Sequence, residues 1–256
     1  MKPKLTLFDV FSYSCMNCLR SLEFIKKVDN KYKKSGLKTI IIHPPEWEFE
    51  KNKKNIRLAS RKYNINFPIK IDRNCKIIKN FNINFWPSQI LAKGRKVIYR
   101  HIGEGNYKKL ENSIIKNLHI KSKKLFNNEP VYKKFPTVYC GKRKRGKIKE
   151  SNDENKLKFG IVYLGENWVQ KDEYLQSLKS NSPMAITTKG KIVNFVAKSE
   201  NNKVIKVNVK LNNKLMKNLS IKNPKLYQIV KLKNNKQRKL TLIADKDIAI
   251  YSFSFQ

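Results

Sequence analysis

Two cysteines three positions apart, Cys15 and Cys18, are the residues of this sequence whose types and spacing most clearly suggest chemistry. They follow a short apolar segment and precede one with helical periodicity, so Cys15 is expected close to a helix start. A thiolate at a helix N-terminus is favoured by unpaired backbone N–H groups and the helix dipole. Thiols at this spacing can close a disulfide ring or bind zinc, so the surrounding sequence must decide between them.

Two further residues fit disulfide exchange. Asp9 lies in the apolar segment six positions before Cys15, where burial is expected to raise its pKa and let it shuttle a proton to and from Cys18. The alternative is a carboxylate at a strand edge or a cap. Pro87 precedes another apolar segment, where a cis-proline would position the backbone of an extended substrate. An ordinary trans turn proline is the alternative.

Three more side chains are expected to contact a protein substrate at this site. Trp86 and Ser88 flank Pro87, and Tyr13 lies two positions before Cys15. The thiols, the proline and these neighbours must be brought together by the fold.

The elements around the cysteines predict that fold. Strands over residues 5–11 and 37–42 enclose a helix over 18–32, which gives a βαβ unit with the Cys-x-x-Cys at its helix start. Further elements are expected as a helix over 53–63, a strand over 67–71, a helical turn over 76–81, strands over 89–92 and 96–102, and a helix over 107–118. Together they predict an α/β thioredoxin-like domain over residues 1–120.

The second half of the chain has a different pattern. Residues 121–157 lose periodicity and contain the basic run Gly141–Lys147, which is typical of a linker. Residues 158–256 then alternate in short apolar segments separated by Asn-rich turns, at 191–197, 204–211, 225–231, 239–243 and 248–255. This predicts an all-β domain, a β-sandwich of jelly-roll type.

The formal net charge of +38 raises nucleic acid as a partner. The lysines are spread over all expected elements, however, and no known recognition motif is present, so solvated lysine faces are the favoured interpretation. No segment approaches the roughly 20 apolar residues of a membrane helix, and the N-terminus lacks a signal peptide. The sequence predicts a cytoplasmic chain without a cofactor.

Four segments together resemble the thioredoxin-like domain of DipZ-type proteins, which are relatives of TlpA-type thioredoxins. They are Phe11–Leu22, His43–Glu50, Phe85–Ser88 and His101–Tyr107. Later segments are similar to the remainder of that family, including its C-terminal β-domain, namely Phe135–Gly141, Leu226–Val230 and Ala249–Phe255.

The resemblance implies a protein-disulfide oxidoreductase that exchanges disulfides with protein substrates and an unidentified electron donor or acceptor. It implies Cys15 and Cys18 as the redox pair and Pro87 as the cis-proline. His43, Glu46 and Glu50 form a signature that tunes the thiols or binds a partner; a helix-start pair of glutamates is the alternative. DipZ-type proteins usually add a membrane electron-transfer domain and place this module outside the cytoplasm, and this sequence shows neither that domain nor a signal.

Two other classes of function remain open from the sequence. A metal site could use Cys15 and Cys18 with His43 or His101, although a second ligand pair of the kind that zinc needs is missing. A protein that binds nucleic acid or glycan could carry the thiols incidentally. The other cysteines, Cys75 and Cys140, are interpreted as small buried side chains or free thiols.

Overall fold

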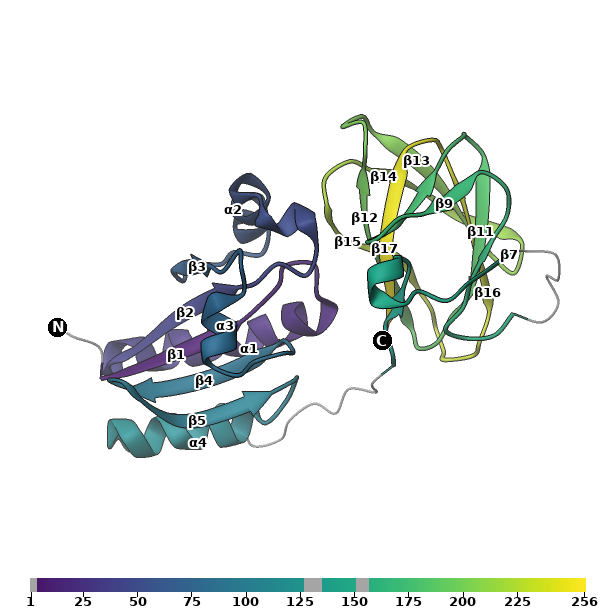
Figure 1. Cartoon of the computed structure of the whole chain (residues 1–256). Helices are drawn as coiled ribbons and strands as arrows, with labels where there is room; N and C mark the ends of the chain where they lie inside the picture. The colour runs from purple at the N-terminus through teal and green to yellow at the C-terminus, as the bar shows by residue number, and fades with distance from the viewer. Residues whose placement is uncertain (1–3, 127–134, 151–156) are drawn as a thin grey trace. The chain divides into compact units, whose positions relative to one another are not determined.

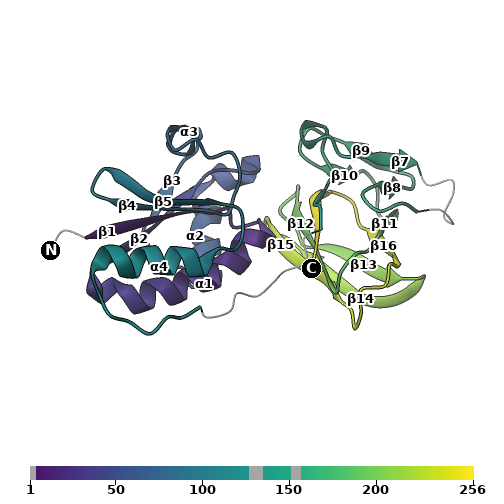
Figure 2. The same cartoon turned by 90° about the horizontal axis from the view of Figure 1, so that it is seen from below.

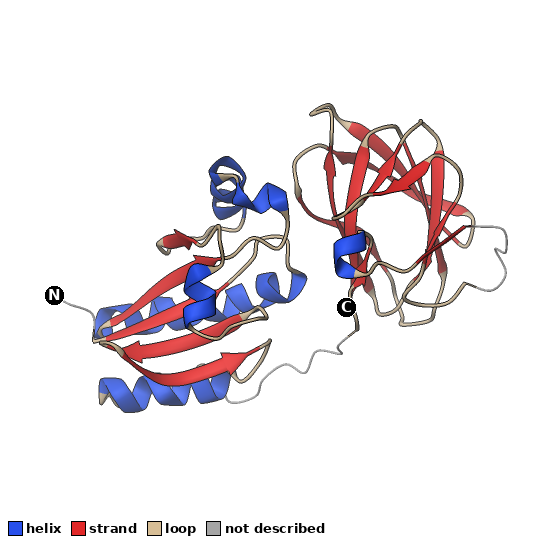
Figure 3. Ribbon diagram, in the orientation of Figure 1, coloured by secondary structure: helices blue, strands red, loops and turns tan. Residues whose placement is uncertain are grey.

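The computed structural model describes residues 4–126, 135–150 and 157–256. The chain divides into two compact units, residues 1–131 and 132–256 (Figure 1). Helices belong to the first unit, and the described part of the second is built of strands apart from one short 3-10 turn (Figure 3).

The first unit is built on a five-stranded sheet in the order β3-β2-β1-β4-β5. Strands β1, β2 and β3 are parallel, and β4 and β5 continue the sheet as an antiparallel hairpin. The strands span Leu5–Val10 (β1), Leu37–His43 (β2), Ile69–Ile71 (β3), Ser88–Lys93 (β4) and Lys96–Ile102 (β5). This is the thioredoxin-like arrangement that the order of apolar segments predicts.

Helices cover both faces of this sheet. The helices are α1 (Met16–Tyr32), α2 (Lys53–Lys62), α3 (Lys76–Asn80) and α4 (Tyr107–Leu118), with 3-10 turns η1 (Lys33–Ser35) and η2 (Glu48–Lys51). Figure 2 shows α1 and α4 side by side on one face. Leu5 and Leu7 of β1 pack with both helices, whereas Val10 packs with α3 on the opposite face. Because side chains alternate along a strand, Asp9 shares the α1 face with Leu7.

The second unit contains two six-stranded sheets among its described residues. One has the order β15-β12-β17-β10-β9 with β6 paired to β17, and the other has the order β14-β13-β16-β11-β8-β7. The strands are Val138–Tyr139 (β6), Ile148–Glu150 (β7), Val162–Leu164 (β8), Trp168–Gln170 (β9), Leu175–Ser177 (β10), Ser182–Thr187 (β11), Ile192–Ser199 (β12), Ile205–Leu211 (β13), Lys214–Ile221 (β14), Lys225–Lys231 (β15), Lys239–Ala244 (β16) and Ile248–Phe255 (β17).

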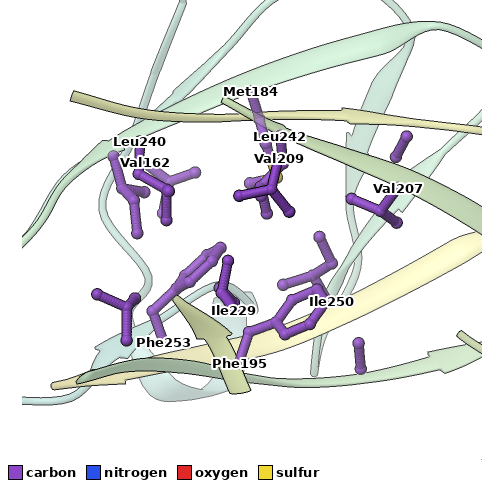
Figure 4. Close-up of a cluster of buried hydrophobic side chains, with 14 of the residues drawn as sticks. Val162, Met184, Phe195, Val207, Val209, Ile229, Leu240, Leu242, Ile250 and Phe253 are labelled. Atoms are coloured by element: carbon purple, nitrogen blue, oxygen red, sulfur yellow. The ribbon is translucent and has the colours of Figure 1, made fainter. Parts of the chain in front are cut away.

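One hydrophobic core holds the two sheets of this unit together. Phe195 and Phe253 come from the first sheet, and Val207 and Leu242 come from the second (Figure 4). All four are fully buried or nearly so. The predicted all-β second domain is therefore present as two sheets that share a core.

The basic run Gly141–Lys147 differs from the expected linker. It forms a folded corner that includes the 3-10 turn η3 (Lys142–Lys144), in which the N–H groups of Lys142 and Arg143 donate to the carbonyls of Lys171 and Asp172. Gly141 is packed so closely that an added Cβ would lie 2.2 Å from the backbone of Glu173. Strands β6 and β7 also lie within the expected linker 121–157, and they pair with β17 and β8 of the second unit. Residues 135–150 therefore belong to the second unit. The Lys- and Arg-rich composition of this run suggested a solvated linker and gave no sign of the packing.

Candidate functional site

The loops that carry the predicted site lie at one end of the strands of the first sheet. Val10, at the end of β1, pairs with Ser88 at the start of β4, and Ser88 also pairs with Ile102 at the end of β5. The N–H of Phe11 donates to the carbonyl of Ile42 near the end of β2 (3.0 Å). The loops that follow β1 and β2 and the loop that precedes β4 therefore meet at this end of the sheet.

Cys15 caps the N-terminus of α1. Its sulfur accepts a hydrogen bond from the backbone N–H of Cys18 (3.3 Å), and its own N–H donates to the carbonyl of Ser12 (3.2 Å). The side chain of Cys15 is half-buried, whereas that of Cys18 is buried. One thiol is thus accessible and accepts an N–H of the first helical turn, and the other lies one turn inside.

Asp9 lies beneath the cysteines in the interior. It is fully buried, and burial raises its pKa to about 7, against a smaller opposing effect of a hydrogen bond from Gln89. The Gln89 amide donates to Asp9 Oδ1 (3.0 Å) and to the hydroxyl of Ser21 on α1 (3.2 Å). Burial, the Cys15 thiol and the Asp9 charge together keep the pKa of Cys18 well above its usual value. β1 is a central strand, so the edge or cap alternative for Asp9 is wrong.

Glu50 joins the segment His43–Glu50 to the loop before Cys15. Its Oε1 accepts hydrogen bonds from the hydroxyls of Ser12 (2.8 Å) and Ser14 (2.7 Å) and from the N–H of Ser14 (3.3 Å). Its Oε2 accepts from the N–H of Glu46 (2.6 Å). The carboxyl of Glu46 in turn accepts from the indole N–H of Trp86 (3.2 Å).

The loop before β4 contains Pro87, and the Trp86–Pro87 peptide bond is cis. Pro87 is buried, Trp86 is half-buried, and the preceding Phe85 is 69% exposed. The carbonyl of Pro87 accepts from the N–H of Gly103 (2.8 Å), which ties this loop to the end of β5.

Two of the side chains expected to contact a substrate are buried instead. Ser88 is inaccessible, and its hydroxyl donates to the carbonyl of Phe85 (2.7 Å). Tyr13 is 2% exposed and stacks on the ring of His43, with 5.5 Å between ring centroids. Both residues support the site from inside, because their side chains are buried in the core. Sequence spacing places them near the thiols but does not give their direction.

His43 lies at the end of β2 and is buried. Burial lowers the pKa of His43 to about 4, so the ring is neutral at physiological pH. Neither ring nitrogen has a hydrogen-bond partner among the described residues. Within the same described residues, no three His, Cys, Asp or Glu side chains are grouped as metal ligands, so the alternative of a zinc site at Cys15 and Cys18 gains no support.

Sequence reasoning did not find the ion pair that secures the start of α1. Arg20 donates to both carboxylate oxygens of Glu104 (2.7 and 2.5 Å) and to the side-chain carbonyl of Asn17 (2.7 Å). Asn17 is one of the two residues between the cysteines. A signal was available, because Arg20 and Glu104 both lie in segments that resemble DipZ-type proteins, but the pairing spans 84 positions.

The remaining cysteines lie outside this site. Cys75 adopts a left-handed conformation before α3, and Cys140 is fully buried in the core of the second unit. Burial raises the pKa of both thiols.

Comparison with known proteins finds one family model and several relatives that resemble this chain. Residues 137–255 match the family described as "Thioredoxin like C-terminal domain". The chain is 35% identical over 109 residues to Protein DipZ of Mycobacterium bovis, covering 42% of this chain and 16% of DipZ. It is 26% identical over 112 residues to the thiol-disulfide oxidoreductase ResA of Bacillus cereus, covering 43% of this chain and 62% of ResA. The chain is thus similar to DipZ and ResA over 42% and 43% of its length.

A third relative extends over more of the chain. NHL repeat-containing protein 2 of Gallus gallus is 26% identical over 231 residues, which cover 81% of this chain and 32% of that protein. The chain thus corresponds to less than two thirds of the length of each of these three relatives. The resemblance to DipZ-type proteins that the motifs indicate is confirmed. Among the described helices, none is long and apolar enough to cross a membrane.

Proposed function

We propose that this chain is a protein-disulfide oxidoreductase that exchanges disulfides with protein substrates through Cys15 and Cys18. The observation that carries the proposal is the pairing of an accessible cysteine at the N-terminus of α1 with a buried one beside the Asp9 carboxyl. This is the arrangement that disulfide exchange requires, because the attacking thiol must reach a partner and the resolving thiol must be withheld from it.

In the reducing direction, the Cys15 thiolate attacks one sulfur of a substrate disulfide. A bond forms between Cys15 and that sulfur, the substrate disulfide breaks, and the other substrate sulfur leaves as a thiolate. The hydrogen bond from the N–H of Cys18 supports the negative charge on Cys15 before the attack.

Cys18 then resolves the mixed disulfide. Its thiol transfers a proton to the Asp9 carboxylate, and the resulting thiolate attacks the sulfur of Cys15. The substrate leaves as its second thiolate, the Cys15–Cys18 disulfide forms, and two electrons have passed to the substrate. With a pKa of about 7, Asp9 can accept and return this proton near neutral pH. The oxidising direction reverses these steps, and an unidentified donor or acceptor regenerates the pair.

Substrate binding is proposed around Pro87. The loop Phe85–Ser88 lies at the same end of the sheet as the loop before Cys15. Trp86 is held by Glu46, and the exposed ring of Phe85 offers an apolar contact to a polypeptide chain. His43 is assigned an indirect role, since its ring stacks beneath Tyr13.

The finer organisation belongs to the same proposal. The redox chemistry is assigned to a domain over residues 1–120, and the second domain, with 158–256 as its main part, is proposed to be a jelly roll, supported by its two predominantly antiparallel sheets. A cytoplasmic location stays a prediction from the sequence. The reduction potential of the Cys15–Cys18 pair against glutathione decides the direction of electron flow.

The test is reduction of a model protein disulfide, such as insulin, by the full chain with dithiothreitol as the electron source. Wild-type protein is expected to accelerate the reaction, and Cys15→Ser is expected to abolish the acceleration. Cys18→Ser, first reduced and then freed of dithiothreitol, is expected to accumulate a mixed disulfide with the oxidised substrate, detectable by mass spectrometry. Full activity of Cys15→Ser would refute the proposal, and Cys75→Ser serves as the control that should change nothing.

A further inference from the structure

Glu50 is a buried carboxylate whose hydrogen bonds converge on the redox loop. Only 1% of its surface is exposed, and its two oxygens accept four hydrogen bonds from Ser12, Ser14 and Glu46. Four donors match the acceptor capacity of an ionised carboxylate. Burial raises the pKa of Glu50, and these hydrogen bonds oppose that effect.

One of the residues that Glu50 holds, Ser12, also contacts both cysteines. The carbonyl of Ser12 accepts the N–H of Cys15 (3.2 Å), and a hydrogen bond from the Ser12 backbone to Cys18 lowers the pKa of that buried thiol against the larger effect of burial. A shift of Ser12 therefore moves a group that is hydrogen-bonded to the backbone of Cys15 and a group that contacts the thiol of Cys18.

Glu50 also connects this loop to the opposite side of the site. The N–H of Glu46 donates to Glu50 Oε2, and the Glu46 carboxyl accepts the indole N–H of Trp86, the residue before Pro87. The loop before Cys15 and the loop that contains Pro87 are thus joined through two glutamates of the segment His43–Glu50.

We propose that Glu50 is a positioning residue that fixes Ser12 and Ser14, and through them sets the balance between the dithiol and disulfide forms of Cys15 and Cys18. The proposal rests on the oxidoreductase function proposed above. Forming the disulfide requires the two sulfurs to approach each other, and the loop that carries Cys15 is anchored by Glu50. An amide at position 50 replaces one acceptor oxygen with a donor, so at least one anchoring hydrogen bond is lost.

The experiment equilibrates the full chain with mixtures of reduced and oxidised glutathione and measures the fraction of Cys15–Cys18 disulfide by alkylation and mass spectrometry. In this reaction the two thiols lose two electrons and two protons, and glutathione disulfide becomes two glutathione molecules. Glu50→Gln is expected to shift the equilibrium constant about tenfold or more. Glu48→Gln is the matched control, since Glu48 lies in the same 3-10 turn with a side chain 69% exposed, and it should leave the constant unchanged.

Ser12→Ala and Ser14→Ala give a second route if Glu50→Gln does not fold. Each is expected to shift the equilibrium constant in the same direction as Glu50→Gln but by a smaller factor. When either serine substitution is combined with Glu50→Gln, the change in the logarithm of the constant should be smaller than the sum of the two separate changes. A folded Glu50→Gln protein with lower stability and an unchanged constant would overturn the positioning role, as would serine variants without effect where Glu50→Gln does not fold. Absence of any reversible dithiol–disulfide equilibrium in the wild type would instead overturn the proposed function.

Discussion

Gln89 holds one oxygen of Asp9 and leaves the other unpartnered. The Gln89 amide donates to Asp9 Oδ1 over 3.0 Å, and Oδ2 has no hydrogen-bond partner in the part of the chain that the structure describes. Burial of an ionised carboxylate is unfavourable when one of its oxygens has no hydrogen-bond donor. The pair therefore keeps Asp9 oriented toward the cysteines and keeps it easy to protonate.

Asp9→Asn is predicted to stabilise the protein above neutral pH. The folded pKa of about 7 exceeds the ordinary value of 3.8, so the wild type has its full stability from this group below pH 4 and loses it as the pH rises through 7. At pH 8 to 9 the gain approaches an upper limit of about 4 kcal/mol, and at pH 4 it is close to zero. Urea unfolding at both pH values measures this, with the exposed Glu23→Gln as control. Equal effects at both pH values would contradict the assignment.

The same variant is predicted to slow resolution of the mixed disulfide. Without a carboxylate to accept the Cys18 proton, the second step should slow by on the order of 100-fold near pH 7. Quenched-flow alkylation of a preformed mixed disulfide separates this step from the attack by Cys15. A normal resolution rate would assign the proton to another acceptor.

The first unit could be predicted closely because its apolar segments are long and regular. The predicted helix over 107–118 has the observed bounds of α4, and the strand over 37–42 is one residue shorter than β2. In the second unit, the predicted strands include neither β8 to β11 nor β14, and β14 shows one reason. It is a strand at the sheet edge in which Leu215 and Met216 are about half exposed between lysines, so no buried face imposes an alternating pattern.

Gly141→Ala is predicted to destabilise the second unit. The added methyl group would overlap the backbone of Glu173 at 2.2 Å, and backbone cannot move aside as a flexible side chain does. The expected cost is about 1–3 kcal/mol. Thermal unfolding of the full chain measures it, and the exposed neighbour Lys142→Ala should change stability by less than about 0.5 kcal/mol. Similar effects of the two substitutions would mean that the basic run is as loosely held as its composition suggests.

The site was predictable in its chemistry but less so in its supports. The residue types of Cys15, Cys18 and Asp9, together with their spacing, indicate disulfide exchange. The contacts of Glu50 with Ser12 and Ser14 span 36 to 38 positions, and serines before a turn are too common to indicate a buried carboxylate partner. Long-range polar contacts of this kind depend on the packed fold, which local patterns do not specify.

His43→Phe is predicted to reduce the loss of stability in acid. The folded pKa of His43, about 4, lies below the ordinary 6.5, so the buried neutral ring contributes stability that is present above pH 6.5 and lost as the pH falls through 4. This amounts to about 3 kcal/mol. Phenylalanine preserves the aromatic contact with Tyr13 and cannot be protonated. The stability difference between variant and wild type, measured from pH 7 to pH 3.5, should grow in favour of the variant; a constant difference would show that His43 does not titrate in this range.

Arg20 and Glu104 are predicted to be strongly coupled in stability. Their side chains are only 12% and 5% exposed, so removing one partner leaves a poorly solvated charge. Arg20→Met and Glu104→Gln should each destabilise the protein, and the double variant should lose less than their sum, with a coupling energy of about 1–3 kcal/mol. Urea unfolding of the four proteins closes the cycle. The more solvated pair on α1, Lys26 and Glu23, with side chains 22% and 66% exposed, supplies a control cycle with an expected coupling of about 0.3–0.5 kcal/mol. Additive effects of Arg20→Met and Glu104→Gln would mean that this ion pair does not secure the start of the helix that carries Cys15.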